Sequence, residues 1–333
     1  GEGKTTLLKL MSGALAPDEG KVLKKSGLKI GYLEQNGGLE SARTVYEEMQ
    51  TVFSDVQRAM DAQREIAAQM TAEEEGSDAF RALSARYEQL DRRIAAQDGY
   101  HADVRIRTVL NGMGFGDMYG QKISDMSGGE KTRLKLCRLL LEQPDILFLD
   151  EPTNHLDVST LFWLESYLKN YRGALFTVSH DRYFLDATVG KIFELENCRV
   201  RAFRGNYSKY KVLKAEQYEH DLREYEKQQE EIAALEDYVA RNIVRATTAR
   251  SAQSRVKKLE NMERLEKPLP PPQPPVFAFE TTEKSEERTL SVEGLDLTAG
   301  EKQLLSGAAF EVRRGEKIAI VGENGAGKST LIR

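Results

Sequence analysis

Two glycine-rich segments of this 333-residue sequence end in a lysine followed by hydroxyl side chains. The C-terminal one reads G-x-x-x-x-G-K-S, in which backbone N–H groups and the lysine surround phosphates and the serine hydroxyl binds Mg²⁺. Its residues are Gly322, Glu323, Asn324, Gly325, Ala326, Gly327, Lys328, Ser329 and Thr330. The N-terminal segment matches the end of the same pattern with Gly1, Glu2, Gly3, Lys4, Thr5 and Thr6. We therefore expect a repeated phosphate-binding domain, cut at both ends of the sequence.

Acidic and histidine side chains follow two apolar segments. Asp150 and Glu151 come directly after residues 146–149, and His180 comes shortly after residues 174–178. Apolar segments of this length are typical of parallel strands, whose carboxyl ends lie where open α/β sheets bind ligands. The alternative is two acids that merely begin a loop.

Two further polar segments accompany this set. Residues 29–35 read as a strand that ends in an exposed glutamine, Gln35, and residues 317–321 read as a buried strand before the second glycine-rich loop. A helix with periodic leucines opens with Ser127, Gly128, Gly129 and Glu130. The spacing of Ser127 and Glu130 is that of a capping box, which could explain both. Adjacent glycines are instead what a helix start needs when its N–H groups approach an anion.

The composition limits the class of protein. The length of 333 residues predicts about two domains. Hydrophobic residues make up 40% and charged residues 30%, which predicts a folded chain with long solvated surfaces. No segment approaches the roughly 18 apolar residues of a membrane span, and no signal peptide opens the chain. We therefore expect a cytoplasmic protein without a membrane partner. The two cysteines are too few for a disulfide framework or a zinc site.

The segment between the repeats has a charged, helical pattern. Apolar residues recur every seven positions over residues 218–239, and a return stretch covers residues 256–265. This predicts an antiparallel helical hairpin whose first arm has about 28 residues. Six of the nine prolines fall in residues 268–275, as in an extended tether.

Charge is segregated along this hairpin. Residues 215–237 contain nine acids and two bases, whereas residues 238–258 contain six bases and no acid. The six bases are Arg241, Arg245, Arg250, Arg255, Lys257 and Lys258. A solvated, charge-balanced coiled coil is the simple explanation. A basic tip on an acidic stem fits contact with phosphates better, and six contacts to unpaired RNA would give a salt slope of about −4.

Taken in order, GKTT, Gln35, SGGEK, ILFLDEPTNHLD and SHDRYFLD resemble the nucleotide-binding domain of ABC ATPases. The resemblance implies an α/β P-loop NTPase fold of ABC type with a helical subdomain, which binds ATP and Mg²⁺. It implies that Lys4 and the backbone around Gly3 hold phosphates, and that Glu151 is the general base and His180 a γ-phosphate contact. The Mg²⁺ ligands it implies are Thr5, Gln35, Asp150 and, in the second loop, Ser329.

The family also implies how two such domains combine. They close head to tail, so that residues 322–330 would face residues 127–131 across one ATP. The other site would need a signature segment that lies beyond this sequence. We therefore expect the intact protein to hydrolyse ATP and this chain alone to be poorly active. Ala299 stands where the family usually stacks an aromatic residue on adenine, which leaves base selectivity open.

The tandem arrangement with its charged linker resembles the ABC-F family of ribosome-associated ATPases. The resemblance implies a first domain at residues 1–205, a linker at 206–287 and the start of a second domain at 288–333. Residues 51–97 resemble the helical arm of some members, or are an enlarged ordinary helical subdomain. The implied partners are the large ribosomal subunit and tRNA, touched by the linker tip.

The role within that family stays open between translation regulation and antibiotic resistance by ribosome protection. A transporter ATPase subunit is one alternative, although it would not require a basic-tipped hairpin. A chromosome-maintenance ATPase is another, but its coiled coil would precede the signature segment.

Overall fold

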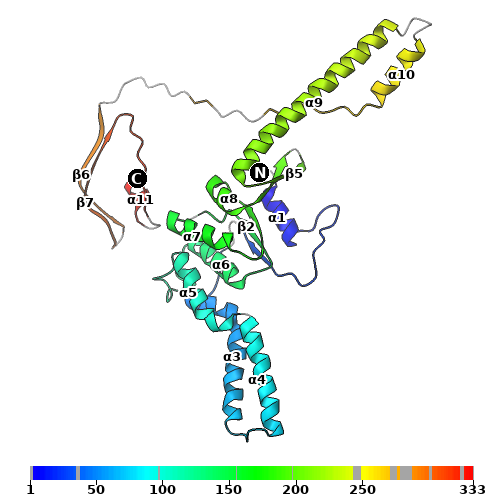
Figure 1. The fold of residues 1–333 in the computed structure, drawn as a ribbon. Helices are drawn as coiled ribbons and strands as arrows, with labels where there is room; N and C mark the ends of the chain where they lie inside the picture. The colour runs from blue at the N-terminus through cyan, green and yellow to red at the C-terminus, as the bar shows by residue number, and fades with distance from the viewer. Residues whose placement is uncertain are drawn as a thin grey trace. The chain divides into compact units, whose positions relative to one another are not determined.

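A computed structural model of the chain describes residues 3–34, 38–96, 98–154, 156–196, 198–242, 249–270, 276–277, 287–299, 302–322 and 326–332. Two compact units are present, shown as a ribbon in Figure 1. The first comprises Gly1–Val189, Leu195–Arg199 and Ser285–Arg333, and the second comprises Gly190–Glu194 and Val200–Lys284. Within the described ranges, no helix has the length and apolar character needed to traverse a bilayer.

A parallel sheet of three strands forms the centre of the first unit. Its strands are β1 (Ile30–Leu33), β2 (Ile146–Asp150) and β3 (Ala174–Val178), in the spatial order β1-β2-β3. Both pairings are parallel, with Asp150 of β2 opposite Val178 of β3. The predicted strands at residues 29–35, 146–149 and 174–178 are therefore confirmed within one or two residues.

Side chains of β2 alternate between two faces of the sheet. Leu147 and Leu149 are fully buried in the main core. Phe148 and Asp150 consequently share the other face, where Phe148 packs against Phe176 of β3 with 5.4 Å between ring centroids. The alternation places the carboxylate of Asp150 away from the main core, at the carboxyl end of the central strand.

Helices surround this sheet and supply its crossover connections. They are α1 (Lys4–Ser12), α2 (Val45–Gln50), α5 (Ala102–Gly112), α6 (Gly128–Glu142), α7 (Val158–Lys169) and α8 (Arg182–Thr188), with short 3₁₀ helices at Thr51–Phe53, Gly99–His101 and Ile123–Asp125. Helix α1 contacts β1 and β2. The leucine period predicted for the helix after Ser127 is confirmed in α6, where Leu134, Cys137 and Leu140 are fully buried.

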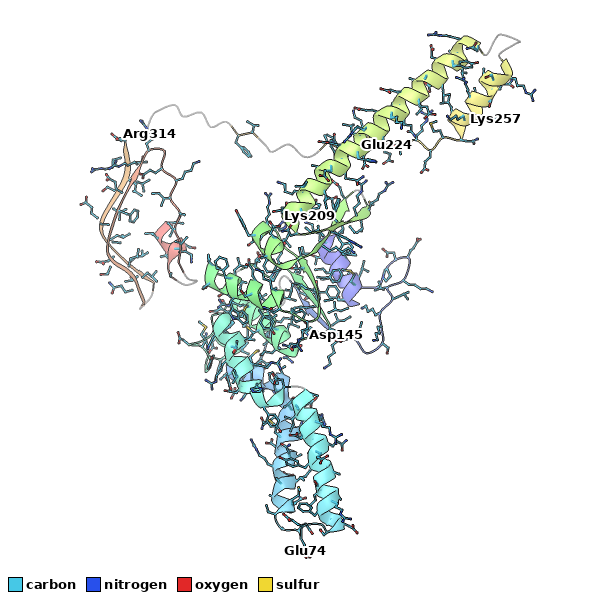
Figure 2. The ribbon with its side chains drawn as sticks, viewed as in Figure 1. Glu74, Asp145, Lys209, Glu224, Lys257 and Arg314 are labelled. Atoms are coloured by element: carbon cyan, nitrogen blue, oxygen red, sulfur yellow. The ribbon has the colours of Figure 1, made fainter. Side chains whose placement is uncertain are left out.

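Two long helices project from the first unit as a hairpin, α3 (Ser54–Met70) and α4 (Asp78–Ala96), which lie side by side in Figure 1. Val56 and Ile66 of α3 and Ile94 of α4 are buried, so the apolar faces of the two helices are covered. Glu74 lies in the connecting turn at the far end (Figure 2). These helices occupy the range for which the sequence predicts an arm or an enlarged subdomain.

The second unit consists of a two-stranded sheet and a helical hairpin. Its elements are most of β4 (Lys191–Glu196) and of β5 (Arg199–Arg204), together with α9 (Tyr207–Asn242) and α10 (Ala249–Glu260). Helix α9 has 36 residues, longer than the predicted arm, because the helix already begins at Tyr207. Its most buried side chains are Ile232, a predicted seam position, and Leu235, which the seven-residue pattern missed.

The C-terminal segment forms a β-hairpin followed by a short helix, and one prediction fails here. The hairpin pairs β6 (Arg288–Ala299) with β7 (Lys302–Arg313), and α11 covers Lys328–Ile332. Residues 317–321 are not a strand, and Val321 is 83% exposed. An apolar strand of a parallel sheet needs a paired strand and covered faces. Within the described residues, no strand pairs with this segment.

Candidate functional site

The two glycine-rich loops have the same local geometry where both are described. Gly3 and Gly327 have φ angles of 77° and 91°, in the left-handed region, and each directly precedes a helix that starts at a lysine. Each glycine carbonyl accepts the first intrahelical hydrogen bond at 2.9 Å, from Leu7 and Leu331 respectively. A side chain at either position would be strained, which explains the glycines. Gly1, Glu2, Glu323, Asn324 and Gly325 lie outside the described residues.

The remaining loop residues lie at the starts of these helices. Lys4, Thr5 and Thr6 form the first turn of α1; Ser329 and Thr330 follow Lys328 in α11, and Ala326 comes before Gly327. The Lys328 ammonium donates a hydrogen bond to the Gly322 carbonyl at 2.6 Å, so this lysine lies across its own loop. Helix starts leave backbone N–H groups without intrahelical partners, which favours an anion.

Asp150 has the properties of a metal ligand. The residue is 2% exposed, and its Oδ2 atom is buried without a hydrogen-bond partner among the described residues. Mg²⁺ prefers a carboxylate combined with hydroxyl and phosphate oxygens to a dedicated protein cage. The ranges described hold no group of three potential side-chain ligands of the His, Cys, Asp and Glu types. Gln35 falls in the part of the chain that is not described.

Glu151 lies in a strained turn beside His180. Its φ angle is 53°, unusual for a residue with a side chain, and such a conformation costs about 1–3 kcal/mol unless its surroundings stabilise it. The Glu151 backbone N–H donates to the Val178 carbonyl at 2.8 Å. Its Oε2 accepts the His180 backbone N–H at 3.3 Å, and its Oε1 lies 3.5 Å from His180 Nε2. The structure therefore brings the predicted base and histidine together.

Two hydroxyl groups next to this pair were not predicted from the sequence. Thr153 Oγ1 lies 3.3 Å from Ser179 Oγ, which also accepts the Asp181 backbone N–H at 3.0 Å. These contacts connect the turn after Glu151 to the turn that contains His180. The sequence signal that could have indicated this contact was a hydroxyl residue two positions after Glu151 and another directly before His180.

The predicted capping box at the start of α6 is confirmed. Glu130 donates its N–H to Ser127 Oγ at 3.4 Å, and its carboxylate accepts the Ser127 backbone N–H at 2.8 Å. Capping thus explains Ser127 and Glu130. Capping does not require a glycine at position 128, and neither does crowding, since a Cβ added there would meet nothing within 4 Å. This open space is what a close approach of an anion to the helix start requires, and Gly129 lies in the same turn.

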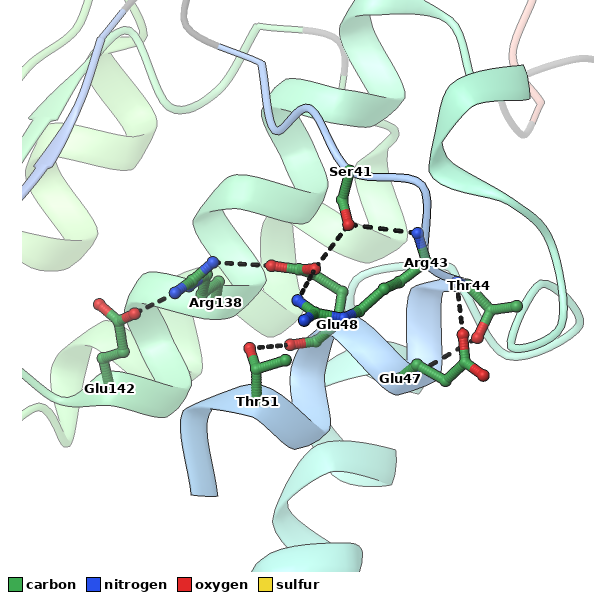
Figure 3. A network of polar contacts seen from close by, with 8 residues as sticks. All are labelled: Ser41, Arg43, Thr44, Glu47, Glu48, Thr51, Arg138 and Glu142. Carbon is green, nitrogen blue, oxygen red and sulfur yellow. Dashed lines mark hydrogen bonds and ion pairs between the residues drawn. The ribbon is translucent and has the colours of Figure 1, made fainter. Parts of the chain in front are cut away.

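A buried carboxylate connects the segment after Gln35 to α6 (Figure 3). Glu48 of α2 is 3% exposed and accepts hydrogen bonds from Ser41 Oγ at 2.8 Å, Arg43 Nη1 at 3.3 Å and Arg138 Nη1 at 2.7 Å. Arg138 belongs to α6, whereas Ser41 and Arg43 precede α2. The network connects the segment before α2, α2 itself and the C-terminal half of α6.

Three of the six linker cations have partners within the hairpin. Arg241 forms an ion pair with Asp237 at 2.8 Å, and Lys258 Nζ pairs with Glu231 at 2.6 Å. The Arg255 guanidinium lies 3.5 Å from the centroid of the Tyr238 ring. These contacts join α9 to α10 or stabilise α9 itself, so they account for part of the basic charge without a ligand.

The other three linker cations are not accounted for by such contacts. Arg250 and Lys257 of α10 are exposed and form no ion pair with the described residues; Lys257 is labelled in Figure 2. Arg245 lies in the gap between residues 242 and 249, which is not described. Within the described hairpin, the cations available to an external partner are therefore Arg250 and Lys257, fewer than the six that the sequence predicts.

Comparison with known proteins agrees with this arrangement. A family model described as "ABC transporter" matches residues 1–154 and 305–333, more than half of the chain, and a second family model with the same description matches residues 193–279. The chain is 43% identical over 335 residues to the protein YdiF of Bacillus subtilis, covering all of this chain and 52% of YdiF.

Two further relatives match along the whole chain. The energy-dependent translational throttle protein EttA of Haemophilus influenzae is 34% identical over 336 residues, which are 59% of its length. The ABC transporter F family member 5 of Arabidopsis thaliana is 35% identical over 336 residues, which are 49% of its length. The chain thus spans about half the length of the curated relatives it matches. With its P-loop NTPase fold, signature helix and following helical hairpin, the chain belongs to the ATP-binding cassette family, in its F subfamily.

Proposed function

We propose that the chain is part of an ATPase that acts on the ribosome during translation. The observation that carries the proposal is the set Asp150, Glu151 and His180 at the carboxyl end of the central strands. Each has a distinct environment: an unpartnered buried carboxylate oxygen, a base held by a backbone amide, and an imidazole at the surface. This set supports hydrolysis of a phosphoanhydride bond.

The proposed cofactor is Mg²⁺, bound with ATP. Asp150 would hold it together with the hydroxyl of Thr5, and Gln35 and, in the second loop, Ser329 are the other ligands proposed. The ion would neutralise charge on the transferred phosphoryl group, where catalysis is mainly positioning and electrostatics. The lysines of the two loops, Lys4 and Lys328, would bind the phosphates.

Glu151 would orient the attacking water and take its proton. The hydrogen bond from the His180 amide holds one carboxylate oxygen. The His180 imidazole is 83% exposed and would contact the γ-phosphate. A general base contributes about 10²–10⁴-fold to the rate, which is the share that Glu151 should supply.

Closure of two nucleotide domains is proposed to complete each site. Residues 127–131 would then face residues 322–330 across one ATP. The open space beside Gly128 supports an anion at the start of α6. Such closure would also move the linker, which joins the two domains in the sequence.

The ribosomal part of the proposal is supported by the F-subfamily relatives, one of which carries the name translational throttle protein. The linker tip would contact RNA of the large subunit or tRNA, in the cytoplasm. Arg250 and Lys257 are the cations best suited to that contact, because neither is paired within the described hairpin.

A Glu151→Gln variant of the full-length protein tests the proposal. ATP binding should remain, whereas turnover should fall about 10²–10⁴-fold. With ATP, the variant should also co-sediment with ribosomes more strongly than the wild type. Glu65→Gln, an exposed carboxylate on the α3–α4 hairpin, is the matched control. Unchanged turnover would remove Glu151 from its role, and recovery with a membrane permease instead of ribosomes would favour a transporter subunit.

A further inference from the structure

A small cavity lies between Glu151 and helix α6. Its volume is about 10 Å³, close to the smallest space that holds one water molecule. Leu33, Leu136 and Leu156 form apolar walls, and Arg133 and Glu151 also line it. All of these residues belong to the first unit, so the cavity is internal to one compact body.

Two polar atoms of the lining residues are buried without a hydrogen bond to any described residue. They are Arg133 Nε, a donor, and Glu151 Oε1, an acceptor. Arg133 is 9% exposed, and the Glu151 side chain is 8% exposed. His180 Nε2 lies 3.5 Å from Oε1, within ion-pair distance, but makes no hydrogen bond to it. Buried donors and acceptors are normally satisfied, by protein or by ordered water.

The position of Arg133 is determined by packing. Its guanidinium carbon lies 4.5 Å from the centroid of the Phe115 ring, a cation–π contact. This contact leaves little freedom for the side chain to turn toward another partner. Arg133 and Glu151 thus line the same small cavity, and each has one buried polar atom without a hydrogen bond to a described residue.

We propose that a water molecule occupies this cavity, accepting the Arg133 Nε–H and donating to Glu151 Oε1. A buried water typically has two to four polar partners, and Asn154, which also lines the cavity, offers another. Arg133 is then a positioning residue for the general base and acts through this water. The catalytic part of this inference rests on the proposed function, whereas the water itself does not.

The bridge would hold the second oxygen of a carboxylate whose first oxygen is held by the His180 amide. With both oxygens held, the plane of the carboxylate is defined, and so is the direction from which Glu151 meets the attacking water. Arg133 lies on α6, in its second turn after Ser127. The orientation of the base would thus depend on α6, whose start is proposed to face the ATP of the other site.

A high-resolution crystal structure tests the water directly. We expect an ordered water within about 2.7–3.2 Å of both Arg133 Nε and Glu151 Oε1. A dry cavity, or a direct bond between the two side chains, would overturn the proposal. This readout does not depend on ATP hydrolysis, so it separates failure of the water bridge from failure of the proposed function.

Kinetics of the full-length protein test the positioning role. Arg133→Lys keeps a cation near Phe115 but lacks the Nε donor, and should lower kcat about tenfold without changing ATP affinity, since small misplacements of catalytic groups can cost up to about 10²-fold. Arg133→Met should lower kcat to a similar extent. Lys135→Met, on the same helix but outside the cavity lining, should leave kcat unchanged.

A double-mutant comparison separates positioning from a structural role. In a Glu151→Gln background, Arg133→Lys should lower the residual turnover by less than about twofold, because groups that act as a unit are not additive. A second full tenfold loss there, or wild-type kcat for Arg133→Lys alone, would show that Arg133 does not act through Glu151.

Discussion

His180 contacts Glu151 with two different groups: its backbone N–H donates to Oε2 at 3.3 Å, and its imidazole Nε2 lies 3.5 Å from Oε1. The Glu151 side chain is 8% exposed, whereas that of His180 is 83% exposed. The backbone contact therefore holds the carboxylate independently of the histidine side chain. The imidazole remains accessible for a ligand at the surface.

This division predicts that His180→Ala will impair turnover without unfolding the protein. The amide that holds Glu151 is retained, and substitution of an exposed side chain changes stability by about 0.5 kcal/mol or less. We expect the melting temperature to stay within a few degrees and turnover to fall about 10²-fold, the lower end for a positioned acid–base group. ATPase assays and thermal denaturation of the full-length protein provide the measurements. His101→Ala, another exposed histidine, should change neither quantity.

The network around Glu48 predicts a large loss of stability. Glu48→Ala would leave Arg138 without the closest of its carboxylate partners and remove an acceptor for Ser41. Breaking a buried ion pair by removing one partner typically costs about 3–5 kcal/mol. Because the Arg138 side chain is 35% exposed, we expect a value near the lower limit, about 3 kcal/mol. Chemical denaturation would measure this difference.

An exposed ion pair on the α3–α4 hairpin is the control for Glu48. The pair between Glu88 and Arg92 at 3.1 Å has side chains 65% and 78% exposed. Glu88→Ala should cost only about 0.3–0.5 kcal/mol. If Glu48→Ala were equally mild, the buried network would not be holding the segment before α2 against α6.

Asp157 predicts a defined pH dependence of stability. Burial disfavours its charged form, but hydrogen bonds from Thr160 and Ser159 to the carboxylate outweigh burial and lower the pKa. Asp157 caps α7 by accepting the Thr160 N–H at 2.8 Å. Because the folded-state pKa is depressed, its contribution is complete above the unfolded value of about 3.9 and is lost as pH falls through the folded pKa.

Two substitutions at Asp157 separate the charge from the cap. Asp157→Asn retains a capping oxygen, so it should reduce the loss of stability between pH 7 and pH 3 relative to the wild type. Asp157→Ala should in addition cost about 1 kcal/mol at neutral pH. Thermal unfolding across that pH range is the measurement. Identical acid sensitivity of the wild type and Asp157→Asn would contradict the assignment.

The unpaired cations of the linker predict a moderate salt dependence of ribosome binding. Each phosphate contact to single-stranded RNA contributes about −0.7 to the slope of log K against log salt. The double variant Arg250→Ala with Lys257→Ala should therefore weaken binding and reduce the slope by about 1.4. Lys258→Ala removes a cation that already pairs with Glu231, so it should change the slope less. Equal slopes for the double variant and the wild type would exclude these contacts.

The sequence by itself determined the order of the motifs, the parallel strands and the starts of the key helices. These features are local: an all-apolar segment such as residues 146–149 can only be a buried strand or helix, and the Ser127 and Glu130 spacing caps a helix whatever surrounds it. The glycines at positions 3 and 327 were likewise readable, because their backbone conformation excludes other residues.

Tertiary structure alone decided which side chains meet. Glu48 and Arg138 form an ion pair although they are far apart in sequence, and Arg133 and Glu151 come to line one cavity, and no spacing rule connects either pair. It also decided that residues 317–321 are not a strand, since a strand of a parallel sheet exists only with a partner to pair with. It further divided the linker cations into paired and available ones, because that distinction depends on which acids of α9 come within reach of α10. Local rules therefore predict elements and their ends, whereas burial and pairing between distant segments determine what those elements can do.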